Sequence, residues 1–242
     1  SLIYEAGEAI LEIYYADDLN ITFKVDDMPV TQADLTSHTI LVNGLSNLTP
    51  SVPVVSEEDS LSISVPRARQ LYWLIDPLDG TKEFIKKSDE FTVNLALIEN
   101  NETIFGIVGI PALKKIYWGG KNYGSFKSLN DSKQRISASK PTDPLRVLSS
   151  KSHLNEKTQS FIDALSRPIE LLQVGSSLKF LLIAEGRGDI YPRLAPTCEW
   201  DTAAAHAILE GSGGTLTQLN GDHVYYGKSD ILNPHFVARG KI

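Results

Sequence analysis

Apolar residues recur at two different spacings along the first half of the chain. In residues 2–15 and 31–45 they fall near every third or fourth position, which predicts two amphipathic helices. Short runs rich in β-branched and aromatic residues predict strands, at residues 52–55, 71–75, 91–99, 104–110, 116–118 and 124–126. Because polar residues separate the last four runs, we expect these to form an antiparallel meander.

The pattern changes after residues 139–144, a segment with two prolines and no apolar periodicity. Beyond it, predicted strands alternate with predicted helices, at residues 145–148, 155–165, 170–174, 176–185, 189–192 and 202–210. Such alternation is typical of a layered α/β arrangement. We therefore predict an α/β (α+β) fold with an N-terminal α+β subdomain at residues 1–142 and a C-terminal α/β subdomain at residues 143–242.

Composition narrows the class of protein without identifying it. The chain has 242 residues, of which 42% are hydrophobic and 22% charged, as in ordinary globular proteins. No apolar run approaches the ~20 residues that cross a bilayer, and the first residues lack a signal-peptide pattern. The single cysteine, Cys198, excludes an internal disulfide. The formal net charge of -7 argues against broad binding to duplex nucleic acid.

The segment at residues 73–81 begins as an apolar strand and ends in two aspartates, Asp76 and Asp79, that are three positions apart. Pro77 follows the first aspartate, and Gly80 and Thr81 follow the second. Pro77 stops further strand pairing, and Gly80 permits a tight path into a new helix. Both carboxylates and the Thr81 hydroxyl can then point into one small space. An alternative remains open, because Asp-Pro and Asp-Gly are common turn formers and threonine is a common helix cap.

Two further segments carry an acidic residue at the end of a predicted strand or the start of a predicted helix. Glu57 follows the apolar run at residues 52–55, and Asp201 opens the helix predicted at residues 202–210. Taken alone, Glu57 is typical of a solvated loop and Asp201 of a helix N-cap. If these two met Asp76 and Asp79, each close pair would repel by ~4 kcal/mol at an effective dielectric near 20. A cluster of this kind stays partly protonated or binds cations.

The order of three motifs resembles the inositol monophosphatase superfamily of lithium-sensitive, metal-dependent phosphatases. The motifs are Glu57-Glu58, Asp-Pro-Leu-Asp-Gly-Thr at residues 76–81, and Trp-Asp-x-Ala-Ala at residues 200–204. The resemblance implies a layered α-β-α-β-α sandwich with most metal ligands in the N-terminal subdomain. It also implies two or three Mg²⁺ ions, the metal that hard oxygen ligands favour.

By the same resemblance, Glu57, Asp76 and the Leu78 carbonyl hold one ion, whereas Asp76, Asp79 and Asp201 hold a second. The superfamily pairs the threonine of Asp-Gly-Thr with the aspartate of a Val-Thr-x-x-Asp motif, which residues 30–34 match. The resemblance therefore assigns Asp34 and Thr81 to orienting and deprotonating the attacking water. Asp34 is also explained as a first-turn carboxylate favoured by the helix dipole.

Within the superfamily, four segments resemble the bacterial 3'(2'),5'-bisphosphate nucleotidases, at residues 79–85, 175–180, 191–193 and 152–153. The implied reaction is hydrolysis of adenosine 3',5'-bisphosphate to AMP and phosphate, which clears a by-product of sulfate assimilation. The sulfonated form, 3'-phosphoadenylyl sulfate, is a possible second substrate.

The implied substrate contacts divide into two groups. On the metal side they are Glu57, Asp79, Gly80, Thr81 and Asp201, and the backbone N–H groups of Gly80 and Thr81 offer a seat for phosphate. On the other side, His153, Ser176, Lys179 and Arg193 would hold the 5'-phosphate. The alternatives are a solvated Lys179, an Arg193 in a surface ion pair and a His153 in an ordinary loop.

Other functions remain open at this stage. An enzyme of the same fold could act on inositol monophosphate or fructose 1,6-bisphosphate, and a non-catalytic regulator could bind the phosphonucleotide without turnover. A haloacid-dehalogenase-type phosphatase is disfavoured, because no Asp-x-Asp pattern lies near the N-terminus. The resemblance implies a cytoplasmic protein, with peripheral attachment to the inner membrane as an alternative, and leaves the oligomeric state open.

Overall fold

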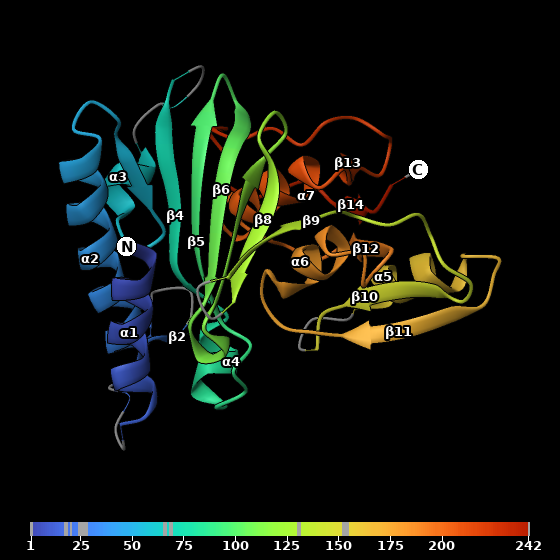
Figure 1. The fold of residues 1–242 in the computed structure, drawn as a ribbon, viewed down its shortest axis with the longest axis horizontal. Helices are drawn as coiled ribbons and strands as arrows, with labels where there is room; N and C mark the ends of the chain where they lie inside the picture. The colour runs from blue at the N-terminus through green and yellow to red at the C-terminus, as the bar shows by residue number, and fades with distance from the viewer. Residues whose placement is uncertain are drawn as a thin grey trace.

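A large mixed sheet and a smaller one form the frame of the molecule (Figure 1). The computed structural model describes residues 2–16, 19, 21–23, 29–64, 67, 70–129, 132–151 and 155–241. The large sheet has the strand order β3-β4-β5-β6-β7-β8-β9. Its strands are β3 (Val54–Ser56), β4 (Tyr72–Asp79), β5 (Thr92–Glu99), β6 (Glu102–Ile110), β7 (Lys115–Gly120), β8 (Gly124–Leu129) and β9 (Ser132–Ile136).

Within the large sheet, β4 to β9 form an antiparallel meander, whereas β3 pairs with β4 in parallel. The polar hairpin connection at Asn100 and Asn101 has both residues at positive φ, 53° and 69°. Asparagine tolerates this left-handed region better than most residues. The parallel pairing of β3 and β4 brings their carboxyl ends to the same edge of the sheet.

The smaller sheet has the order β11-β10-β12-β14-β13. Its strands are β10 (Leu145–Ser149), β11 (Ile169–Gln173), β12 (Ile190–Arg193), β13 (Thr215–Gln218) and β14 (Phe236–Arg239). The first three are parallel, and β14 and β13 are added antiparallel. Residues 137–144 connect the two sheets, and the subdomain boundary at residue 142 stays a prediction within that segment.

Helices fill the spaces outside and between the sheets. They are α1 (Leu2–Tyr14), α2 (Gln32–Leu48), α3 (Ser60–Ser64), α4 (Thr81–Ile85), α5 (Glu156–Asp163), α6 (Leu178–Ala184) and α7 (Glu199–Gly211). The short pieces β1 (Thr22–Phe23), β2 (Pro29–Val30) and the 3₁₀ turn η1 (Pro111–Leu113) complete the described elements.

Three clusters of buried apolar side chains separate the layers. One lies between the α1–α2 pair and the large sheet, the second encloses α6 and α7 between the two sheets, and the third joins α5 to the small sheet. The order of layers is therefore helix, sheet, helix, sheet, helix, as predicted. Among the described residues, every helix is too short or too polar to cross a lipid bilayer.

The sequence pattern missed β9, β13 and β14. In β9, four of five residues are exposed, so no apolar alternation marks the strand. Strands β13 and β14 have four residues each and pair with each other across a loop of 17 residues, from 219 to 235. Short strands with distant partners carry little local signal.

Helix α7 approaches the large sheet unusually closely. A Cβ built on Gly106 of β6 would lie 2.0 Å from the Ala204 carbonyl oxygen. Beside it, the Thr103 hydroxyl donates a hydrogen bond of 3.0 Å to the Ala203 carbonyl. This contact is between backbones, so no side-chain rotation can relieve an added methyl group. Gly106 thus fixes the distance between the sheet and α7.

We expect Gly106→Ala to lower the free energy of unfolding by about 1–3 kcal/mol or more, because overpacking must push α7 away. Urea unfolding followed by circular dichroism measures the change. Gly7→Ala in α1 is the matched control, since its Cβ would meet Pro111 at an ordinary 3.4 Å. The control should be neutral or slightly stabilising. Equal stability of the Gly106→Ala variant would contradict the inferred contact.

Candidate active site

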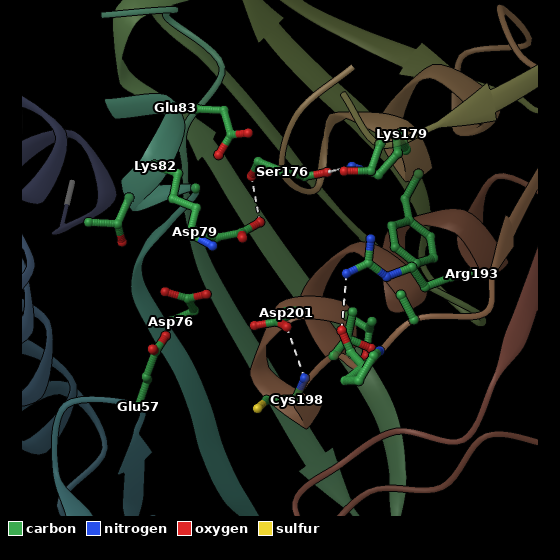
Figure 2. A pocket seen from close by; sticks show the side chains of 18 of the residues that line it. Glu57, Asp76, Asp79, Lys82, Glu83, Ser176, Lys179, Arg193, Cys198 and Asp201 are labelled. Atoms are coloured by element: carbon green, nitrogen blue, oxygen red, sulfur yellow. Dashed lines mark hydrogen bonds between the residues drawn. The ribbon is translucent and has the colours of Figure 1, made fainter. Parts of the chain in front are cut away.

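A pocket of about 510 Å³ opens where β3 and β4 end, and it is lined by residues from both halves of the chain. The end of β4, the start of α4, the loop before α6, the end of β12 and the start of α7 all contribute to its wall. Figure 2 shows carboxylates on one side of the pocket, with Lys179 and Arg193 on the other. The pocket is therefore electrostatically divided.

Three carboxylates form the tightest group on the acidic side. Oxygen atoms of Glu57, Asp76 and Asp201 all lie within 4.8 Å of one another. Glu57 follows β3, and its N–H donates to the Ile75 carbonyl at 3.2 Å, which places it beside Asp76. Asp201 reaches the same point from the first turn of α7. The structure thus brings together residues that are 144 positions apart in the sequence.

Burial and mutual repulsion disfavour ionisation of this cluster. The pKa of Asp76 is raised well above its usual range by burial, and then by the charges of Glu57 and Asp79. The pKa of Asp201 is raised in the same way, by burial and then by Asp79 and Glu57. A hydrogen bond of 2.9 Å from the Cys198 N–H to Asp201 only partly offsets this. A divalent cation would remove the conflict, so this all-oxygen set fits a hard metal ion.

Asp79 lies next to the trio but faces a different partner. Its Oδ2 atom accepts hydrogen bonds from the Ser177 N–H at 2.9 Å and from the Ser176 hydroxyl (Figure 2). The trio within 4.8 Å does not include Asp79, although its charge raises the pKa of both Asp76 and Asp201. A shared metal ion involving Asp79 stays a prediction.

Asp34 and Thr81 meet at the edge of the pocket. Asp34 is buried in the first turn of α2, where its Oδ2 accepts from both the N–H and the hydroxyl of Thr31 at 2.7 Å. Its other oxygen accepts a bond of 3.2 Å from the Thr81 hydroxyl. Burial raises the pKa of Asp34. The carboxylate is therefore both a capping group of α2 and a proton acceptor for Thr81.

The turn between β4 and α4 shapes the floor of the pocket. The Leu78 N–H donates to Asp76 at 3.1 Å, and the Leu78 carbonyl accepts from the Thr81 hydroxyl at 3.3 Å. Gly80 has a φ of +91°, and a Cβ there would come within 3.1 Å of the Glu90 carbonyl. The positive φ favours glycine, and the nearby carbonyl leaves little room for a side chain. Helix α4 then begins at Thr81 and runs for only five residues.

Lys179 is buried on the basic side, so the alternative of a solvated lysine is wrong. Its Nζ donates to the carbonyls of Ser176 at 2.6 Å and Val174 at 3.2 Å, and lies 5.3 Å from the centre of the Tyr191 ring. Burial lowers the pKa of this amine to about 8. Lys179 thus holds the loop before α6 as well as lining the pocket.

Arg193 lines the pocket from the end of β12, and its Nη2 donates to the Pro196 carbonyl at 3.0 Å. Ser176 also lines the pocket, but its hydroxyl is bonded to Asp79. His153 lies outside the described residues. Of the four residues expected to hold a 5'-phosphate, the structure therefore brings three to the lining of one pocket.

Sequence reasoning missed Asn94, Ser177 and Thr92, which support the acidic side from behind. Asn94 donates to the Ser177 hydroxyl at 3.0 Å and accepts from the Thr92 hydroxyl at 3.0 Å. Asn94 interrupts an otherwise apolar strand, and a buried polar residue at such a point was the available signal. Ser177 lies in the segment at residues 175–180 that resembles the nucleotidases, but no role was predicted for it.

Comparison with known proteins places this fold and pocket in one class. Residues 1–241 match the inositol monophosphatase family, and the chain belongs to that family. The fold is shared with an IMPase of Thermotoga maritima, at a TM-score of 0.80 and 23% identity, over 98% of this chain and 89% of that one. The predicted superfamily and sandwich fold are confirmed.

Within the family, the chain is similar to proteins named 3'(2'),5'-bisphosphate nucleotidase CysQ. It is 41% identical to that of Salmonella typhimurium over 97% of this chain and 95% of the relative. Identity to the Escherichia coli K12 protein is 40% over the same shares. The crystal structure of CysQ from Bacteroides thetaiotaomicron, a bacterial member of the family, superposes with a TM-score of 0.87 at 37% identity, over 100% of this chain and 95% of that one.

Asp76→Asn should stabilise the metal-free protein while weakening its response to Mg²⁺. A carboxyl whose pKa is raised on folding lowers stability at every pH above its unfolded-state pKa, and most above the raised value, so replacing it with a neutral amide helps in that range. For a chain of this size, each 1 kcal/mol gained raises Tm by about 2–4 °C. Scanning calorimetry near pH 7 with EDTA, and then with Mg²⁺, measures both effects.

The pH dependence provides the control for this prediction. As the pH falls through the raised pKa, Asp76 of the unaltered protein takes up a proton in the folded state, and the advantage of asparagine should begin to shrink. The advantage should disappear only below the ordinary aspartate pKa of the unfolded chain. A variant that is less stable than the parent at neutral pH without metal would contradict the inferred repulsion.

Proposed function

We propose that this protein is a magnesium-dependent phosphomonoesterase that converts adenosine 3',5'-bisphosphate to AMP and phosphate. The observation that carries the proposal is the divided pocket, with carboxylates on one wall and Lys179 and Arg193 on the other. A bisphosphate needs two anion sites, one at the reacting phosphate and one at the remote phosphate. The names of the relatives that are about 40% identical support the same substrate. 3'-Phosphoadenylyl sulfate is a second candidate substrate.

The acidic wall fits Mg²⁺ rather than a softer metal, because the donors are carboxylate and carbonyl oxygens. Glu57, Asp76, Asp79, Asp201 and the Leu78 carbonyl would hold two or three ions. When bound, Mg²⁺ neutralises the transferred phosphate and stabilises charge on the leaving oxygen. Because the pKa values of Asp76 and Asp201 are raised, binding of Mg²⁺ releases protons from these carboxyls. The affinity for Mg²⁺ should therefore decrease as the pH is lowered.

Asp34 and Thr81 prepare the attacking water. The Thr81 hydroxyl donates a hydrogen bond to Asp34 Oδ1, so the Thr81 oxygen can accept a hydrogen bond from water on the pocket side. As the water attacks phosphorus, the bond between phosphorus and the 3'-oxygen of the nucleotide breaks, and the departing oxygen takes a proton from solvent. The proton of the attacking water passes to Thr81, and the Thr81 proton passes to Asp34. The raised pKa of Asp34 makes it a better base than an exposed aspartate.

The basic wall would hold the remote 5'-phosphate and so orient the 3'-phosphate. Arg193 presents a planar set of donors suited to phosphate. Lys179 contributes positive charge from behind the loop, with Ser176 at the loop surface. The backbone N–H groups of Gly80 and Thr81 remain candidates for contact with the reacting phosphate.

Phosphate release from a substrate panel tests the specificity. With Mg²⁺, we expect rapid release from adenosine 3',5'-bisphosphate, slower release from 3'-AMP, little from AMP or inositol 1-phosphate, and none with EDTA. Arg193→Met should raise KM for the bisphosphate about 10-fold or more, since it removes a charge-assisted contact worth about 1.5–3 kcal/mol.

The same Arg193→Met variant should change KM for 3'-AMP much less, because that substrate has no 5'-phosphate. Faster release from inositol 1-phosphate than from the bisphosphate would instead favour the inositol-specific alternative. Tight binding of the bisphosphate without any release, in Mg²⁺, would favour the non-catalytic alternative.

Thr81→Val should lower kcat about 100-fold or more while the protein still folds, because the water loses its path to Asp34. Thr39→Val is the matched control: Thr39 lies exposed on α2 and its hydroxyl bonds only to the Leu35 carbonyl among the described residues. Steady-state phosphate release measures both variants. Full activity of Thr81→Val would remove the proposed Asp34–Thr81 pair from the mechanism.

A further inference from the structure

A buried polar chain crosses from the large sheet to the loop before α6. Asn94 of β5 and Ser177 each have only 1% of their surface exposed. Asn94 donates to the Ser177 hydroxyl at 3.0 Å, while its own carbonyl accepts from Thr92 at 3.0 Å. Fully buried polar groups are costly unless they are paired, so this chain specifies one arrangement of the two segments.

Ser177 joins two of the carboxylate residues of the site. Its N–H and its hydroxyl lie 2.9 Å and 3.1 Å from Asp79 Oδ2. The same hydroxyl lies 3.1 Å from the backbone carbonyl of Asp201. Asp79 belongs to β4 and Asp201 to α7, so one serine bridges two elements that approach the pocket from different directions.

The Asn94 amide orients this serine. A hydroxyl has one proton to donate, and the Asn94 N–H occupies the oxygen from behind. The Ser177 proton is thereby directed toward Asp79 and the Asp201 carbonyl. Asn94 also lies 3.5 Å from Asp79 itself, a weaker contact.

The hydrogen bonds fall on only one oxygen of Asp79. Within the described residues, the donors to this carboxylate all contact Oδ2, and they come from Thr92, Asn94, Ser176 and Ser177. Such one-sided bonding fixes the rotation of the carboxylate and leaves Oδ1 available for a cation.

The backbone of the loop is held in an unfavourable conformation to make these contacts. Ser176 has a φ of +47°, in the left-handed region that serine rarely adopts. Lys179 stabilises this loop through the Val174 and Ser176 carbonyls. Strain of this kind persists where the surrounding contacts outweigh it, often at functional sites.

We propose that Ser177 and Asn94 are positioning residues that set the spacing between Asp79 and Asp201, and thereby the affinity for a Mg²⁺ ion that both residues would hold. The proposal rests on the proposed function only in taking Asp79 and Asp201 as metal ligands. Ser177 acts directly on Asp79, and Asn94 acts mainly through Ser177, with a weaker contact of its own to Asp79.

Ser177→Ala and Asn94→Leu test this proposal in the full chain, with Mg²⁺ as the probe. Removing groups that orient metal ligands typically weakens metal affinity 10–100-fold. We expect calorimetric titration without substrate to show about 10-fold weaker Mg²⁺ binding, and the Mg²⁺ concentration for half-maximal phosphate release to rise equally. At saturating Mg²⁺, KM for the bisphosphate should change less than twofold.

Ser212→Ala is the matched control, since Ser212 is also buried and its hydroxyl bonds to the Leu209 carbonyl at the far end of α7. Ser177→Thr keeps the hydroxyl and should recover much of the Mg²⁺ affinity. Melting curves in EDTA identify any variant that fails to fold. Such a variant is replaced by Thr92→Val, which removes the hydrogen bond from the Thr92 hydroxyl to the Asn94 side chain.

Folded Ser177→Ala and Asn94→Leu variants that bind Mg²⁺ as tightly as the parent would overturn the proposal. A rise in KM with unchanged Mg²⁺ affinity would do the same, since it would place Ser177 in substrate binding. If the parent binds Mg²⁺ but releases no phosphate, the proposed function fails, while the calorimetric comparison still decides this inference.

Discussion

The structure depends on one electrostatic conflict, the convergence of buried carboxylates that repel one another. Burial is the largest cause of the raised pKa of both Asp76 and Asp201, and neighbouring charges add to it. A folded chain keeps such an arrangement only when the surrounding packing is strong enough to bear it. Here three layers of apolar contact supply that packing. The destabilisation is confined to the pocket, where a bound cation would offset the repulsion between the carboxylates.

The fold imposes this convergence through two contacts of the backbone. Parallel pairing of β3 with β4 carries Glu57 to the side of Asp76. Close approach of α7 to Gly106 carries Asp201 to the same place from the opposite end of the chain. Because α7 is enclosed between the two sheets, neither half of the chain forms the acidic cluster by itself. The acidic cluster therefore forms only when the two sheets pack around α7.

The basic wall has a different construction. The amine of Lys179 is already hydrogen-bonded within the protein. It donates to two carbonyls of the loop that carries Ser176 and Ser177. Through Ser177 this loop contacts Asp79 and the backbone of Asp201. A few buried hydrogen bonds therefore join the two walls.

The sequence alone determined the family, because the three acidic motifs are local signals, and the resemblance to that family implied the layer order and the candidate ligands. The hydrophobic periodicities, which are also local, predicted most of the helices and strands. The resemblance also paired Asp34 with Thr81, and in the structure the Thr81 hydroxyl lies 3.2 Å from Asp34 Oδ1. The sequence left β9, β13 and β14 undetected and gave no role to Asn94 or Ser177. Only the tertiary structure decided that Lys179 is buried, that Asp79 faces Ser176 and Ser177, and that Glu57, Asp76 and Asp201 form the tight trio. These features depend on how distant segments pack and on which partner each polar group finds, and neither is encoded in the spacing of residues along a chain.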